Sequence, residues 1–183
     1  PGLGFNAISS KARRVAKACK RPGSYWDWSE RLESDEFYMS FCGTAPEQLM
    51  FGLRAAIDMI NEEGVANVFS RHYRLSRAIH AGIDRWAEGG MLENNSLNED
   101  ERSNSVTAIL LDKQFDPMIL RELCREKFNL ALGNGMGKIE QESFRIGHMG
   151  DLNEGMIFGT LGIIETALEL LRIPHGTGAV NAA

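Results

Sequence analysis

The sequence of 183 residues predicts an α/β protein in which a long helix precedes a small α+β domain. Between residues 47 and 86, apolar residues recur every three or four positions, the period of an amphipathic helix. After residue 105 the pattern is strand, helix, strand, strand, helix, which is typical of helices on one face of a small sheet. We therefore expect residues 65–183 to form a small C-terminal domain. Residues 1–64 are expected to be the end of a larger domain with a linking helix.

The long helix is predicted from an apolar stripe that runs through Leu49, Leu53 and Ile57. Gly64 interrupts the stripe, which resumes and continues to Trp86, so the pattern allows one bent helix or two successive helices. His72 and His80 lie on the second part, but they are eight positions apart without a carboxylate at ligand spacing. We therefore predict no metal site.

The small domain is predicted element by element. Asp116 followed by Pro117 is a helix start signal, since a capping carboxylate precedes proline in the first turn. Asp151, with Glu154 three positions later, predicts the start of the last helix. The predicted strands are residues 105–111, 130–132 and 143–149. Residues 92–104 are predicted to be a loop, and the tail after residue 176 is expected to fray.

The N-terminal part is predicted to hold a short helix at residues 11–21 with a serine cap. The segment Tyr25-Trp26-Asp27-Trp28 then gathers three aromatic side chains. These side chains could stack on a ligand, or they could anchor a long connection to the surface. The chain also opens at Pro1 without an initiator methionine, which we interpret as the start of a fragment or processed product.

Composition and charge exclude several classes. With 20 Lys plus Arg against 25 Asp plus Glu, the net charge of −5 argues against a nucleic-acid binder. No apolar run approaches the about 20 residues that a membrane-spanning helix needs. The three cysteines are far apart and form no CxxC pair, which favours a reducing, cytoplasmic location.

Arg145 is the first candidate functional residue, because it stands inside a predicted strand between Phe144 and Ile146. Burying an arginine there is costly unless an anion pairs with it, and its planar fork suits a carboxylate or phosphate. Ligand binding and an internal ion pair with a glutamate are equally compatible with the pattern. The nearby glycine cluster at 133–138 lacks the spacing and the following helix of a phosphate-binding loop.

Gly43 and Thr44, just before the long helix, form the second candidate. A Gly-Thr turn at a helix entrance offers backbone N–H groups and a hydroxyl, which suit a phosphate. The alternative is that Thr44 merely caps its own helix.

Four motifs in one order carry a family resemblance. They are PGLGFNAISxKA at 1–12, YWDW at 25–28, FxGTAPxQLxFGL at 41–53 and FRIGHMGDLNE at 144–154. In this order the sequence resembles the class V aminotransferases, in particular the alanine/serine–glyoxylate branch with its aspartate-using members. The resemblance runs through nearly the whole chain.

The resemblance implies an aspartate-aminotransferase-like fold (fold type I), with residues 1–64 ending the large cofactor-binding domain. It implies a homodimer with shared sites and pyridoxal 5'-phosphate held by a lysine. An amino group would pass from serine, alanine or aspartate to glyoxylate or a similar 2-oxo acid. Arg145 matches the arginine for the substrate α-carboxylate. Thr44, beside Gly43, matches the threonine that reaches the cofactor phosphate of the neighbouring subunit, although relatives often carry a bulkier residue in place of Gly43.

The lysine of the family is expected upstream of Pro1, so no catalytic residue is assigned within this chain, which by itself should be inactive. A non-catalytic α+β module that binds a protein partner is the alternative function. A lyase or desulfurase of the same fold is less consistent with the sequence, because Cys124 falls within a predicted helix.

Overall fold

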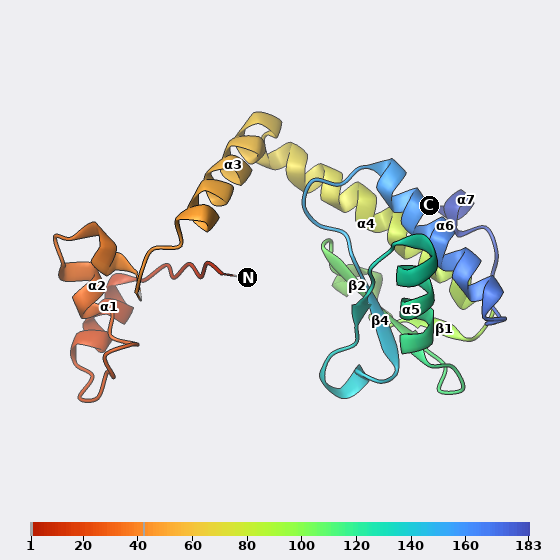
Figure 1. Cartoon of the computed structure of the whole chain (residues 1–183), viewed down its shortest axis with the longest axis horizontal. Coiled ribbons are helices and arrows are strands. Elements are labelled where there is room, and N and C mark those ends of the chain that lie inside the picture. The colour runs from red at the N-terminus through yellow and green to blue at the C-terminus, as the bar shows by residue number, and fades with distance from the viewer. Residues whose placement is uncertain (1, 42) are drawn as a thin grey trace. The chain divides into compact units, whose positions relative to one another are not determined.

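A computed structural model describes residues 2–41 and 43–183 (Figure 1). Pro1 and Cys42, which belong to two of the motifs above, lie outside the described residues. The chain divides into two compact units, Pro1–Glu63 and Gly64–Ala183, and each is described by itself. Among the described residues, no helix combines the length and the apolar character needed to cross a membrane.

In the first unit, all the regular elements that the structure describes are helices. Its elements are α1 (Ser10–Lys17), α2 (Ser29–Glu33), the 3₁₀ helix η1 (Phe37–Ser40) and α3 (Glu47–Glu63). The hydroxyl of Ser9 accepts a hydrogen bond from the backbone N–H of Ala12 at 3.2 Å, so α1 has the predicted serine cap. α1 ends earlier than the predicted residue 21, and α2 and η1 follow the aromatic segment, where no helix was predicted. None of the side chains described in this unit is buried.

The second unit begins at Gly64, which has φ of 85° and ψ of 129°. Glycine adopts such a positive φ readily, whereas residues with a Cβ rarely do. Because this backbone is not helical, the helix is interrupted at Gly64, and the apolar stripe is divided between α3 and α4 (Val65–Ala87). Ile79, Ile83 and Trp86 of α4 are buried, as the stripe predicted, whereas Val65 and Phe69 at the start of the stripe are exposed.

The sheet has four antiparallel strands in the order β1-β2-β4-β3. The strands are β1 (Leu92–Asn94), β2 (Val106–Leu111), β3 (Gly133–Asn134) and β4 (Ser143–Gly147). Two differences from the sequence prediction concern the edges of this sheet. β1 lies in the segment predicted to be a loop, because three residues are too few to show an alternating pattern.

The predicted strand at residues 130–132 is wrong, and β3 follows it at 133–134. Asn129 adopts the left-handed conformation, with φ of 55°, at the C-terminus of α5 (Pro117–Phe128). The N–H of Leu130 then donates to the carbonyl of Cys124 at 3.0 Å, so this backbone terminates the helix instead of joining the sheet.

Two helices complete the C-terminal half. α6 (Glu154–Leu170) is capped by Asn153, whose side chain accepts from the N–H of Met156, and the predicted cap Asp151 lies outside the helix. The tail does not fray. It forms α7 (Ala179–Ala182), which packs against α4 and α6 with Ala179 fully buried.

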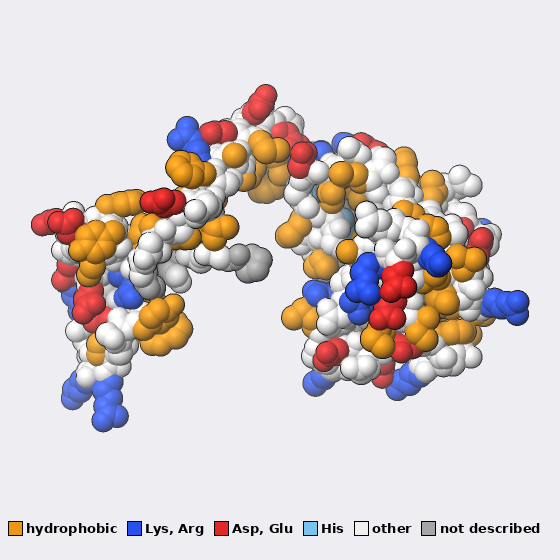
Figure 2. Space-filling model, in the orientation of Figure 1, with side chains coloured by type: hydrophobic (Ala, Val, Ile, Leu, Met, Phe, Trp, Pro, Cys, Tyr) orange, Lys and Arg blue, Asp and Glu red, His pale blue; other side chains and the backbone are white. Residues whose placement is uncertain are grey.

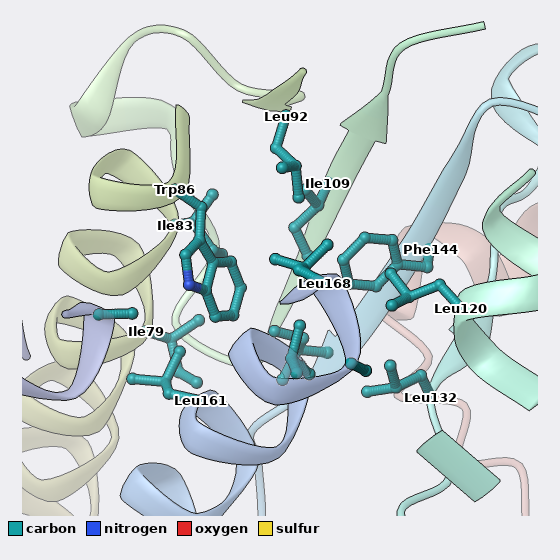
Figure 3. Close-up of a cluster of buried hydrophobic side chains, with 14 of the residues drawn as sticks. Ile79, Ile83, Trp86, Leu92, Ile109, Leu120, Leu132, Phe144, Leu161 and Leu168 are labelled. Atoms are coloured by element: carbon teal, nitrogen blue, oxygen red, sulfur yellow. The ribbon is translucent and has the colours of Figure 1, made fainter. Parts of the chain in front are cut away.

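The core of the second unit lies between one face of the sheet and the helices (Figure 3). Ile109 of β2 and Phe144 of β4 are opposite each other in register, and both are fully buried. Trp86 of α4 and Leu168 of α6 approach them from the helical side (Figure 3). The predicted α/β class, with a long helical segment and a small α+β domain, is confirmed.

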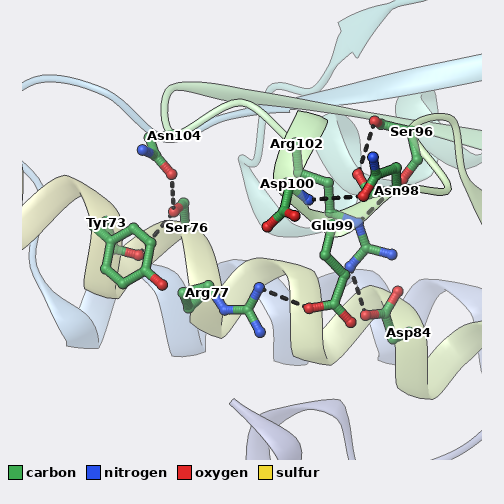
Figure 4. A network of polar contacts seen from close by, with 10 residues as sticks. All are labelled: Tyr73, Ser76, Arg77, Asp84, Ser96, Asn98, Glu99, Asp100, Arg102 and Asn104. Carbon is green, nitrogen blue, oxygen red and sulfur yellow. Dashed lines mark hydrogen bonds and ion pairs between the residues drawn. The ribbon is translucent and has the colours of Figure 1, made fainter.

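Polar contacts hold the β1–β2 connection, which includes the 3₁₀ helix η2 (Glu99–Glu101), onto α4 (Figure 4). Arg102 pairs with Asp84 at 2.6 Å, and Arg77 pairs with Glu99 at 3.1 Å. Because the Arg102 side chain is only 8% exposed, its ion pair is better shielded from water than the others at this surface.

Candidate functional site

Arg145 projects from the face of the sheet opposite the core. Its neighbours Phe144 and Ile146 are buried, so strand alternation turns Arg145 to the other face, where Ala108 of β2 and Gly133 of β3 stand opposite it. Its Nε donates a hydrogen bond to the carbonyl of Asn134 at 2.7 Å. Within the described residues, no carboxylate forms an ion pair with Arg145, so the structure does not support the internal ion pair.

Gly43 and Thr44 lie between η1 and α3, and both are exposed. The carbonyl of Pro46 accepts the first helical hydrogen bond of α3, from the N–H of Met50 at 3.1 Å. The N-cap position is therefore Pro46, and Thr44 does not cap this helix. Gly43 has φ of 143°, with open space where a side chain would stand, so its backbone conformation alone favours glycine.

The site residues predicted from the sequence thus fall in different units: Gly43 and Thr44 in the first, Arg145 in the second. Each offers a group for an anion. The Thr44 hydroxyl can donate to a phosphate oxygen, and the Nη groups of Arg145 can donate two parallel hydrogen bonds to a carboxylate.

A buried histidine pair next to β4 was not predicted. Nε2 of His148 lies 2.8 Å from Oγ1 of Thr107, and the rings of His148 and His80 are 6.1 Å apart. Burial lowers the pKa of His148 to about 4, and burial also lowers the pKa of His80. The alternation of Phe144, Ile146 and His148 was a signal that could have placed His148 in the core.

Glu165, Glu169 and His175 bring three possible metal ligands within 4.8 Å of one another. Both carboxylate oxygens of Glu165 already accept N–H hydrogen bonds, from Gly178 at 2.6 Å and from Ala179 at 2.8 Å. Trp86 donates to the same carboxylate at 3.2 Å. This group therefore fastens the start of α7 to the core, and the geometry supports a structural role.

The aromatic segment of the first unit borders an apolar cavity of about 510 Å³ between α1 and residues 22–28. Val15, Trp26 and Trp28 line it. Trp26 is also 76% exposed and packs edge-on against Tyr25 at 5.1 Å. Apolar side chains are also at the surface elsewhere in this unit (Figure 2). Phe37 and Phe51 are 70% and 77% exposed. The segment therefore borders the apolar side of α1 and keeps Trp26 exposed.

The chain is similar in sequence to several known aminotransferases. No protein-family model matches the chain. The serine–glyoxylate aminotransferase of Arabidopsis thaliana is 34% identical over 182 residues, which are 100% of this chain and 44% of the relative. The L-aspartate–glyoxylate aminotransferase of Paracoccus denitrificans is 29% identical over 183 residues, 100% of this chain and 45% of the relative. The chain thus spans less than half the length of these relatives and corresponds to their C-terminal part.

The fold is shared with solved aminotransferases. The structure of pyridoxamine–pyruvate aminotransferase from Mesorhizobium loti superposes with a TM-score of 0.80 at 23% identity. This match covers 96% of the present chain and 45% of the solved one.

Proposed function

Because this chain is a homologue of the C-terminal part of the class V glyoxylate aminotransferases, we propose that the complete protein is a pyridoxal-phosphate-dependent aminotransferase. It transfers an amino group from serine, alanine or aspartate to glyoxylate or a similar small 2-oxo acid. The observation that carries this proposal is Arg145, whose guanidinium pairs with no carboxylate of the described residues and lies on the face of the sheet away from the core. The proposal includes a cytoplasmic homodimer, in which each site uses residues of both subunits.

Arg145 binds the α-carboxylate that amino donors and 2-oxo acceptors share. A bidentate pair fixes the substrate in position and orientation, because a planar fork facing a carboxylate allows little rotation. One arginine can therefore serve both half-reactions, in which donor and acceptor occupy the site in turn.

Gly43 and Thr44 fit the cofactor phosphate. Both are exposed, neither is part of a helix, and the Thr44 hydroxyl makes no hydrogen bond within the described part of the chain. The bound cofactor would supply the electron sink for transamination. Thr44 would hold its phosphate, across the subunit boundary, and the lysine that binds the cofactor would come from the sequence that precedes Pro1 in the complete protein.

The test is Arg145→Lys in the complete protein. The variant keeps the positive charge but loses the fork, and a hydrogen bond to a charged group contributes about 1.5–3 kcal/mol. We therefore expect kcat/KM for serine and glyoxylate to fall about 10- to 100-fold. Arg125→Lys, on the exposed side of α5, is the matched control and should leave kcat/KM unchanged. Equal kcat/KM in Arg145→Lys and the parent would remove Arg145 from the substrate site.

A binding module is the competing function, and the exposed Trp26, Phe37 and Phe51 favour it. The absorption spectrum of the complete protein separates the two. A protein carrying the lysine-bound cofactor absorbs visible light, whereas a module without cofactor is colourless. A colourless protein that turns over no amino donor with glyoxylate would support the module.

A further inference from the structure

The glycine cluster at 133–137, which is not a phosphate loop, lies directly beside Arg145. β3 and β4 pair so that Gly133 is opposite Arg145 and Asn134 is opposite Phe144. Side chains of opposite residues share one face of an antiparallel sheet, so Arg145 extends over the backbone of Gly133.

The register also determines where the carbonyl of Asn134 points. The N–H of Gly135 donates to the carbonyl of Ser143 at 3.1 Å, which makes 135 and 143 a hydrogen-bonded pair. In an antiparallel ladder such pairs alternate, so the backbone groups of Asn134 point away from β4, toward the free edge of the sheet. To donate to this carbonyl at 2.7 Å, Arg145 must cross Gly133.

The space beside residue 133 suits glycine. A Cβ at Gly133 would lie 3.3 Å from Cβ, 3.4 Å from Nε and 3.6 Å from Nη2 of Arg145. The first distance is shorter than an ordinary contact and the other two are close to van der Waals contact, so the Arg145 side chain would have to shift by a few tenths of an ångström. An alanine at 133 would therefore displace the guanidinium slightly from the carbonyl of Asn134.

The hairpin that carries Asn134 is itself well fixed. Oγ of Ser143 donates to the carbonyl of Ile139 at 2.6 Å, which closes the loop containing the 3₁₀ helix η3 (Gly137–Ile139). Nε of Arg121 donates to the carbonyl of Leu132 at 3.1 Å, which holds the entry to β3. The acceptor for Arg145 thus belongs to a backbone that is tied at both ends.

We propose that Gly133 and the carbonyl of Asn134 form a frame that aims the Arg145 guanidinium, and that this frame sets the preference of the enzyme for substrates with an α-carboxylate. Because Nε is hydrogen-bonded to the carbonyl and the guanidinium is planar, the directions of the two remaining donor groups, Nη1 and Nη2, are fixed together. The inference rests on the proposed function, because it assigns the carboxylate to Arg145. Gly133 is a positioning residue, since it acts only through Arg145.

The experiment compares Gly133→Ala, Arg145→Lys and the double variant in the complete protein, with an α-amino acid as donor and glyoxylate as acceptor. A misplacement of about 1 Å can cost about 100-fold in rate, and the shift expected here is smaller, so we expect Gly133→Ala to lower kcat/KM about 3- to 10-fold. The loss should appear mainly as a raised KM and as weaker binding of the 2-oxo acid in calorimetry. In the Arg145→Lys background, Gly133→Ala should add nothing, because the group that it displaces is gone.

Two further measurements separate positioning from general damage. An amine without a carboxylate, tested in the half-reaction that releases its carbonyl product, should react equally fast with the parent and with Gly133→Ala. Gly159→Ala on α6 adds a methyl group that meets nothing within 4 Å, and it should leave kinetics and binding unchanged.

The outcomes distinguish the two proposals. If Arg145→Lys has no effect, the proposed function of Arg145 fails. If Arg145→Lys lowers kcat/KM but Gly133→Ala does not, the frame is wrong and the proposed function of Arg145 stands. The same conclusion follows if the losses in kcat/KM of the two single variants multiply in the double variant. An equal loss for the amine without a carboxylate would also overturn the frame, because it would show damage beyond carboxylate recognition.

Discussion

The two units differ in how their apolar side chains are accommodated. In the second unit, Trp86, Ile109 and Phe144 are fully buried in one continuous core. In the first unit, none of the side chains described is buried, and Phe51 is 77% exposed. Both units have amphipathic helices, so local pattern alone does not explain the difference.

The difference shows what a helix gains from its surroundings. α4 packs on a sheet and on α6 and α7, which remove its apolar side chains from Leu75 to Trp86 from water. α3 has a similar stripe, with Leu49 43% exposed and Ile57 43% exposed. Because most helical stability in proteins comes from such packing, we expect the stability of this chain to reside in the second unit.

The largest expected effect is the contrast between Trp86→Ala and Phe51→Ala. Removing a fully buried aromatic side chain costs about 3–5 kcal/mol in free energy of unfolding, and Trp86 also donates to Glu165. Removing the exposed ring of Phe51 should change this free energy by less than about 0.5 kcal/mol. Urea unfolding followed by circular dichroism measures both. Similar losses for both variants would show that the first unit also has a core under these conditions.

Acid should destabilise the second unit selectively. The pKa of His148 falls from its ordinary value of 6.5 to about 4 in the fold, because burial disfavours the charged ring. The unfolded chain therefore binds more protons between these values, and the free energy of unfolding decreases as pH falls from 6.5 to 4, by about 3 kcal/mol. The lowered pKa of His80 acts in the same direction.

Urea midpoints measured between pH 7 and pH 5 test this dependence above the range where carboxylates titrate. His148→Gln cannot take up a proton, so its stability should change less over the same range. A pH dependence as steep as that of the parent would exclude His148 as its source.

The smallest expected effect comes from the helix caps, one in each unit. The carboxylate of Asp116 accepts from the N–H of Met118 at 2.8 Å at the start of α5, so Asp116→Ala should lower the free energy of unfolding by about 1 kcal/mol. Ser9 caps α1 by accepting from the N–H of Ala12 at 3.2 Å, but α1 contributes nothing to the core. Ser9→Ala should leave the main urea transition in place, and a shift as large as that of Asp116→Ala would couple α1 to the core.

The sequence predicted those elements whose stability is local. Asp116-Pro117 predicted α5, and the apolar stripe that continues to Trp86 predicted the buried part of α4, because capping and periodicity act within a few residues. β1, β3 and α7 were missed or misplaced. Each of them is too short to carry a period and exists through contacts that are distant in sequence, such as Glu165 with Gly178 and Ala179.

The residues proposed for the site divide in the same way. Arg145 was singled out from the sequence because a charged side chain between apolar strand neighbours is unusual. The role proposed for Gly133 could not be read from the sequence, because it depends on the register of β3 with β4. His148 carried a readable signal in its alternation with Phe144 and Ile146, whereas its partner His80 lies on another element.

The hydrogen bond between Arg145 and Asn134 also bears on how the sheet ends. β3 is an edge strand, and its outward backbone groups are where a strand of another molecule could add. The carbonyl of Asn134 already accepts from Arg145, so a charged side chain stands where an incoming strand would have to pair. The bond that aims the guanidinium thereby protects this edge against aggregation by strand addition.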